Sequence, residues 1–98
     1  MTIKKEQNGS ELTLIIEGRL DTTTAPDLEK VIVGECEGVE KLILDLKTLE
    51  YISSAGLRVF IKAQKMMNEQ GTMIIRNVNE TVNEIFDITG LLSIFEIE

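Results

Sequence analysis

The sequence has no histidine and no tryptophan, and it has only one cysteine, one proline and 4% aromatic residues. Without histidine, an ordinary zinc site and a Ser-His-Asp triad are excluded. A Gly-Lys-Ser/Thr phosphate-binding motif is missing as well. The single cysteine, Cys36, excludes a disulfide within the chain, and we expect it to be a small core or helix-end residue. These absences predict that the protein is not an enzyme and has no metal or cofactor of its own.

Basic residues are scarce too. Ten lysines and arginines stand against seventeen acidic residues, so the formal net charge is −7. This balance argues against nucleic acid or an anionic membrane as a partner. A protein with a basic surface is the more natural partner of an acidic domain, although solubility alone also accounts for the charge.

Long apolar runs are absent. No run approaches the roughly 20 residues that span a bilayer, and residues 1–6 lead into polar sequence rather than into the apolar region of a signal peptide. We therefore expect a cytoplasmic protein that does not insert directly into a membrane and that is a monomer when free.

The residues that are present alternate between strand and helix patterns over a length that fits one domain, 1–98. Asn8-Gly9-Ser10 predicts an antiparallel hairpin between the first two strands, and the later alternation predicts parallel strands with crossover helices. The fold class is therefore α/β, with a mixed, largely parallel sheet of about five strands. The expected strands are 2–7, 12–18, 41–46 and 72–77, and 92–97 is expected to be a final short strand or a docked tail. The expected helices begin at residue 24, at 53 or 54, and at 79.

Some positions also predict how the elements pack and end. Segment 41–46 is apolar on nearly both faces, which is typical of a central strand covered on both sides. Asp45 within it is expected to pair with a backbone amide or to lie exposed at the end of the sheet. Thr24 is the expected cap of the first helix, with Pro26 in its first turn. The pair Met66-Met67 is expected to pack rather than to line an interface.

Two hydroxyl-rich segments, 21–24 and 49–54, each join a strand to a helix. Sites in parallel sheets gather outside the carboxyl ends of the strands, so we expect these segments to be neighbours at one edge. Asp21 in the first segment either simply ends its strand or contributes to a contact surface there. The two segments together are the candidate functional region.

Ser53 and Ser54 lie at the expected start of the second long helix. A phosphate on either hydroxyl would be close to the helix amides and to the positive end of the helix dipole, so the domain would tolerate it. Serines are also common as simple helix caps, and the local sequence alone does not separate the two roles.

Three stretches resemble the STAS domain of bacterial anti-sigma factor antagonists. They are Gly18-Arg19-Leu20-Asp21 with the threonines after it, Leu42-Ile43-Leu44-Asp45-Leu46, and Ile52-Ser53-Ser54-Ala55-Gly56-Leu57. The resemblance covers essentially the whole chain in length and element order. In that family the switch motif runs Asp-Ser-Ser/Thr-Gly-Leu, and the phosphorylated serine stands two residues before the glycine. The resemblance therefore implies Ser54 as the phosphoacceptor.

The resemblance also implies a partner-switching cycle. The unphosphorylated antagonist binds an anti-sigma factor that is a serine kinase, which frees the sigma factor, and phosphorylation ends the binding until a serine phosphatase restores it. The ATP and magnesium belong to the kinase. The implied partner-binding residues are Asp21, Thr22, Thr23, Thr24, Ser53, Ser54, Ala55, Gly56, Leu57 and Arg58.

This chain departs from the family motif at two positions: Ser53 occupies the aspartate position, and Ala55 replaces the second hydroxyl. In addition, Arg58 follows the leucine where a small residue is common. Ser53 is therefore the rival acceptor to Ser54. A STAS accessory or scaffold subunit of a transporter or stress-signalling assembly, not phosphorylated, is the alternative function.

Overall fold

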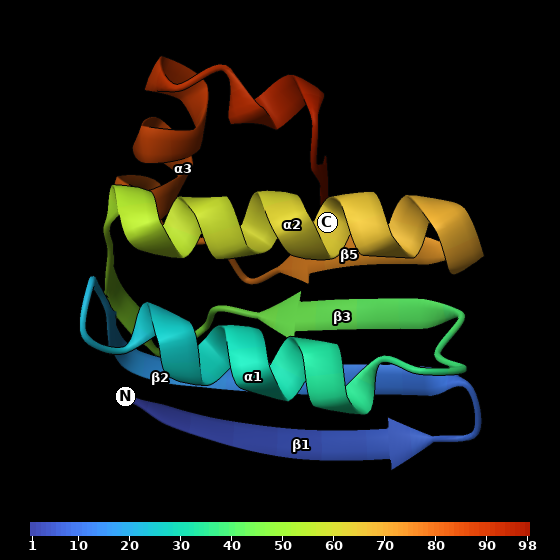
Figure 1. Cartoon of the computed structure of the whole chain (residues 1–98). Coiled ribbons are helices and arrows are strands. Elements are labelled where there is room, and N and C mark those ends of the chain that lie inside the picture. Colours follow the sequence, from blue (N-terminus) through green and yellow to red (C-terminus); the bar gives the residue numbers. More distant parts are fainter.

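The computed structural model describes all residues, 1–98 (Figure 1). The N-terminal half forms a hairpin, a helix and a strand, and the second half alternates strands with helices. None of the helices has the length and apolar character needed to cross a membrane. The elements in chain order are β1 (Thr2–Asn8), β2 (Glu11–Leu20), α1 (Ala25–Glu35), β3 (Lys41–Asp45), β4 (Leu49–Ile52), α2 (Ser54–Gln70), β5 (Thr72–Arg76), α3 (Glu80–Ile88), the 3-10 helix η1 (Leu91–Ser93) and β6 (Glu96–Ile97).

The strands form one mixed sheet in the order β1-β2-β3-β5-β6, with β4 paired to the end of β2. β1 and β2 are antiparallel, and all the other pairs are parallel. The hairpin closes where Asn8 is opposite Glu11, and Gly9 in the turn has a φ of +62°, which glycine adopts without strain. The predicted hairpin and the largely parallel sheet are both confirmed.

β4 is a strand within a segment that the sequence assigned to a loop. It pairs with the last residues of β2, where Arg19 is opposite Tyr51 and Leu20 is opposite Ile52. The register shifts between Gly18 and Arg19, and Gly18 has a φ of +91°. This irregularity lets β2 pair first with β3 and then with β4, which raises the strand number to six.

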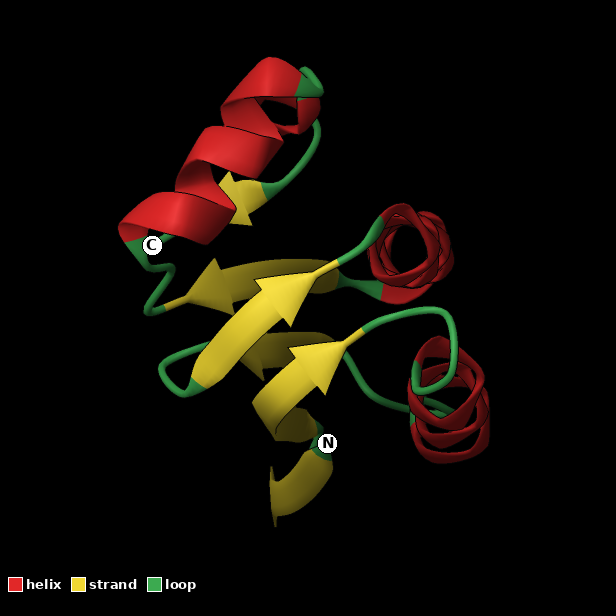
Figure 2. Ribbon diagram, turned by 90° about the vertical axis from the view of Figure 1, so that its left-hand side faces the viewer, coloured by secondary structure: helices red, strands yellow, loops and turns green.

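Helices α1 and α2 lie side by side on one side of the sheet, as Figures 1 and 2 show, and α3 lies apart from them near β6. The core lies between this helix pair and the sheet, and it extends to Val82 and Phe86 of α3, Leu91 of η1 and Phe95. β3 is central in the sheet, between β2 and β5, and its residues are buried on both faces, as expected. Ile43, opposite Thr13 and Ile74 in the neighbouring strands, is only 2% exposed although it is not part of the core cluster.

Other expected packing roles are confirmed. Cys36 is 1% exposed and is the C-terminal cap residue of α1, where burial, and then the Glu35 carboxylate, raise the pKa of its thiol. Asp45 accepts a hydrogen bond from the Lys47 amide at 3.0 Å and another from the side chain of Asn77 at 3.0 Å. Met67 is fully buried.

The three phenylalanines of the chain form one cluster that joins α3 to the rest of the fold. Phe60 of α2, Phe86 of α3 and Phe95 before β6 have ring centroids 5.4 to 6.4 Å apart, in tilted or edge-to-face contacts. Such pairs stabilise a fold beyond the burial of their area. The few aromatic residues of the sequence thus hold its C-terminal part in place.

Candidate functional site

The two strand-to-helix segments are neighbours, as the sequence predicts. Leu20 at the end of β2 is opposite Ile52 at the end of β4. The amide of Ser53 donates a hydrogen bond to the carbonyl of Leu20 at 2.9 Å. Helices α1 and α2 both begin at this edge, on the left of Figure 1. The candidate site is therefore the surface around the first turns of the two helices.

The loop before α1 is organised by Asp21. Its Oδ1 accepts hydrogen bonds from the Thr23 hydroxyl at 2.7 Å, the Thr23 amide at 3.0 Å and the Thr24 amide at 3.2 Å. The Thr23 hydroxyl, and then the Thr23 amide, hold the pKa of the Asp21 carboxyl below its usual value. A charged carboxylate thus stays next to the amino end of α1, where the helix dipole favours it.

Thr24 occupies the cap position of α1 but does not cap it with its side chain. Its hydroxyl donates to the Arg19 carbonyl at 3.0 Å and accepts from the Asp21 amide at 2.9 Å. Thr24 is therefore the cap residue by position, as expected, but its hydroxyl does not bond the helix. The first amides of α1 instead reach backbone carbonyls, Ala25 that of Asp21 at 2.8 Å and Asp27 that of Thr24 at 3.0 Å. Pro26 lies in the first turn as predicted, and the acidic Asp27 lies there as well. Asp21 and Thr24 hold the loop together, whereas Thr22 and Thr23 are exposed.

Ser53 and Ser54 have different places at the start of α2. Ser53 is the N-cap in an extended conformation, and its hydroxyl accepts a long hydrogen bond from the Gly56 amide at 3.4 Å. Its carbonyl accepts the first intrahelical bond, from the Leu57 amide at 2.9 Å. Ser54 is the first helical residue and is exposed. The first turn of α2 contains no acidic residue.

Gly56 and Leu57 are buried beneath the first turn of α2. Gly56 is buried, and a Cβ there would lie 2.7 Å from Cγ of Leu20 and 2.9 Å from Cγ1 of Ile52. Only a residue without a side chain lets α2 approach the ends of β2 and β4 this closely. Leu57 is 8% exposed and belongs to the core. The pair fixes the position in which Ser54 is presented.

A shallow groove of about 220 Å³ separates the first turns of α1 and α2. Arg58 at its rim is exposed and takes part in none of the five ion pairs of the protein. The lining residues from the two helices and the preceding loop are Thr22, Ala25, Pro26, Glu29, Ala55, Arg58 and Val59.

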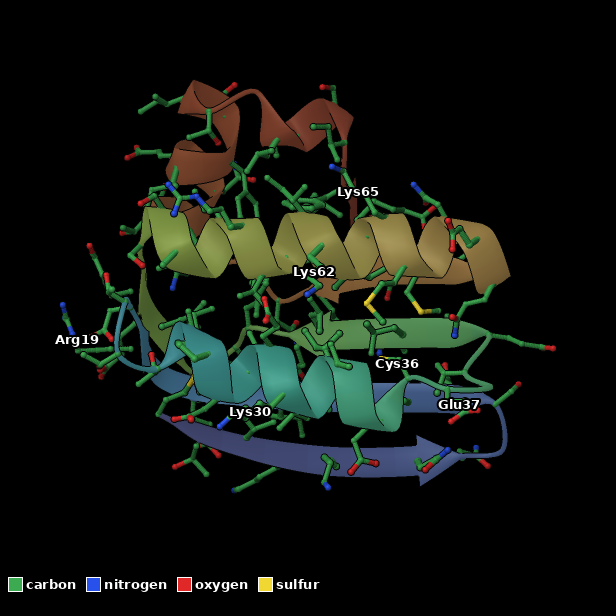
Figure 3. All side chains as sticks on the ribbon, in the orientation of Figure 1. Arg19, Lys30, Cys36, Glu37, Lys62 and Lys65 are labelled. Carbon is green, nitrogen blue, oxygen red and sulfur yellow. The ribbon has the colours of Figure 1, made fainter.

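One contact at this edge, the stacking of Arg19 on Tyr51, is not predicted by the sequence. The Arg19 guanidinium carbon lies 4.4 Å from the centroid of the Tyr51 ring, and both residues are exposed. Figure 3 shows Arg19 at the end of the molecule where both helices begin, far from Cys36 at the other end of α1. The contact depends on the pairing of β2 with β4, for which the sequence contains no local signal.

The STAS domain family model matches residues 2–98. The anti-sigma-B factor antagonist of Bacillus subtilis (strain 168) is 34% identical to the chain over 98 residues, which are 99% of this chain and 90% of that protein. The chain therefore belongs to the STAS domain family, among its anti-sigma factor antagonists. This is a family of regulators rather than of enzymes.

Solved structures show the same fold. An anti-sigma factor antagonist from Mycobacterium paratuberculosis superimposes with a TM-score of 0.88 at 22% identity, over 98% of this chain and 83% of that one. The Bacillus cell fate determinant SpoIIAA in its phosphorylated form gives a TM-score of 0.78 at 17% identity, over 99% and 91% of the two chains. The α/β prediction and the STAS resemblance are both confirmed.

Proposed function

We propose that the chain is an anti-anti-sigma factor that acts by partner switching, with Ser54 as the phosphoacceptor. In the unphosphorylated form it binds an anti-sigma factor serine kinase, and a sigma factor is released. Phosphorylation of Ser54 ends the binding, and a serine phosphatase restores it. The chain is a ligand and a substrate in this cycle rather than a catalyst, because ATP and magnesium are bound by the kinase.

The difference between the two serines is the observation that supports Ser54 most directly. Ser54 is exposed, whereas the Ser53 hydroxyl accepts from the Gly56 amide and its backbone is bonded on both sides, to Leu20 and to Leu57. A kinase that modified Ser53 would have to disturb the cap of α2. Phosphorylation of Ser54 leaves that cap intact.

Electrostatics explains how one phosphate could end the binding. A phosphoserine adds a charge of about −1.5 to −2 at neutral pH. If the kinase covers Ser54, an unpaired phosphate in the interface costs on the order of several kcal/mol, and each 1.4 kcal/mol is about tenfold in affinity. SpoIIAA, which shares this fold, has been solved in both unphosphorylated and phosphorylated forms, so the fold itself is compatible with the modification.

The test uses the anti-sigma factor kinase that co-purifies with the chain. After incubation with ATP and magnesium, intact-mass measurement should show one added phosphate on the wild type and on Ser53→Ala, and none on Ser54→Ala. Phosphorylated wild type should then lose at least a hundredfold in affinity for the kinase, measured by calorimetry.

Two outcomes would contradict the proposal. Loss of the phosphate only in Ser53→Ala would assign the modification to the rival serine. Equal kinase affinity before and after phosphorylation would remove the switch, whichever serine is modified. Circular dichroism of both variants controls for folding.

A further inference from the structure

We propose that Arg58 forms an ion pair with the phosphate on Ser54 and holds it against the surface of α2. Arg58 would then be a positioning residue for the phosphate. The inference rests on the proposed function, because it concerns the phosphorylated form of Ser54. It goes beyond that function because it assigns a role to a side chain at a position where the family commonly has a small residue.

The first argument is the spacing on the helix. Ser54 is the first residue of α2, and Arg58 follows it by four residues, so the two side chains lie on one face, one turn apart. Both are exposed. The order also favours the pair, because an acidic group four residues before a basic one is the better orientation on a helix. Gly56 and Leu57 between them are buried and do not compete for the phosphate.

The second argument is that the charged residues around Arg58 have other partners and form no ion pair with it. The acid of α1 that lines the groove is Glu29, and it pairs with Lys62 of α2 at 3.6 Å. Asp21 in the loop before α1 is engaged by Thr23 and Thr24. Arg19, the other arginine at this edge, is stacked on a tyrosine ring. Arg58 therefore has no competing ion pair to break.

The third argument concerns the unmodified protein. The first turn of α2 has no acidic residue, so no negative side chain there offsets the positive end of the helix dipole. A phosphate on Ser54 supplies that negative charge. Phosphorylation thus creates two favourable interactions at once, with the amides of the first turn and with the guanidinium of Arg58. The pair should favour the dianionic phosphate near neutral pH.

The experiment measures the ionisation of the phosphate directly. Phosphoserine is placed at position 54 during synthesis of the full chain, so no kinase is needed, and its second pKa is followed by phosphorus NMR. Replacing Arg58 by glutamine should raise this pKa by about 0.3 unit, the size expected of an exposed i, i+4 ion pair. The control Lys65→Gln removes an exposed cation further along the same helix and should leave the value unchanged.

A second control moves the phosphate to position 53, five residues before Arg58 and on a different side of the helix. There Arg58→Gln should have little effect. The proposal is overturned if Arg58→Gln leaves the second pKa of phosphoserine 54 unchanged. It is also overturned if Lys65→Gln shifts this pKa equally, or if Arg58→Gln shifts the pKa of phosphoserine 53 equally, because the shift would then reflect the net charge of the protein rather than a specific ion pair. Because the phosphate is installed without a kinase, a failed titration is distinct from a kinase that does not modify Ser54.

Discussion

The starts of α1 and α2 lie next to each other at the same edge of the sheet but differ in charge. The start of α1 holds a permanent carboxylate, Asp21, which accepts three hydrogen bonds within 3.2 Å from Thr23 and Thr24. The start of α2 has an uncharged cap, Ser53, with one long hydrogen bond, and next to it the exposed Ser54. The positive end of the α1 dipole is therefore offset by a full negative charge, whereas that of α2 has only an uncharged hydroxyl next to it.

This difference shows where a negative charge can act as a switch. Near Asp21 the charge is already present and is bound to its own loop, so an added phosphate there would meet a like charge. Near Ser54 no acid precedes or follows in the first turn, and Arg58 lies one turn away. The proposed modification adds to α2 the kind of charge that α1 has permanently.

The largest effect is expected from Gly56→Ala, which tests how closely α2 approaches the strands. The added Cβ would overlap Leu20 and Ile52, so we expect a loss of about 1–3 kcal/mol in the free energy of unfolding. Gly34→Ala in α1 is the matched control, because nothing lies within 4 Å of its added Cβ and the helix should gain roughly 0.5 kcal/mol. Urea unfolding of both variants measures the difference, and equal stabilities would contradict the packing role of Gly56.

The next effect is that of Ser53→Ala, which removes the cap of α2. We expect a loss of about 1 kcal/mol in the free energy of unfolding, the usual value for a lost serine cap. Ser54→Ala, at the exposed neighbouring position, should change it by less than about 0.5 kcal/mol. A larger loss in Ser54→Ala than in Ser53→Ala, measured by urea unfolding, would reverse our assignment of the two serines.

A smaller effect, of opposite sign, is expected from Ser53→Asp, which makes the start of α2 more like that of α1. A carboxylate at the cap interacts with the helix dipole, so we expect a gain of about 0.3–1 kcal/mol. The gain should shrink in 1 M salt, because salt screens exposed charges. Thermal unfolding at low and high salt measures it, and a gain that is independent of salt would have a different cause.

The smallest effect is the pH dependence that Asp21 contributes. Its pKa is lowered in the folded state, so its charge stabilises the fold at pH values above its unfolded pKa, and this contribution is lost as the pH falls through the folded pKa. Asp21→Asn keeps the shape of the side chain but removes the charge. We expect the difference in unfolding temperature between wild type and Asp21→Asn to narrow from pH 5 to pH 2. A constant difference would show that the charge plays no part.

Much of the fold could be predicted because its signals are local. The turn at Gly9, the start of α2 at Ser53 and its end before Gly71 all follow from the chemistry of a few consecutive residues. The cap position of Thr24 also follows from local sequence, but the bonds of its hydroxyl do not. That hydroxyl bonds Arg19 and Asp21 rather than the amides of α1, and only the path of the loop decides this.

The sequence by itself determined the order of the main helices and strands other than β4, the α/β class and the register that places Ser54 two residues before Gly56. These features depend on which residue types stand a few positions apart in the sequence, and that spacing is the same whether or not the chain is folded. Only the tertiary structure decided that β4 is a strand, that helices cover one face of β3, and that Gly56 must lack a side chain against Leu20. Those features depend on which distant segments meet, and the close approach of α2 to the end of β2 is a property of the packed fold.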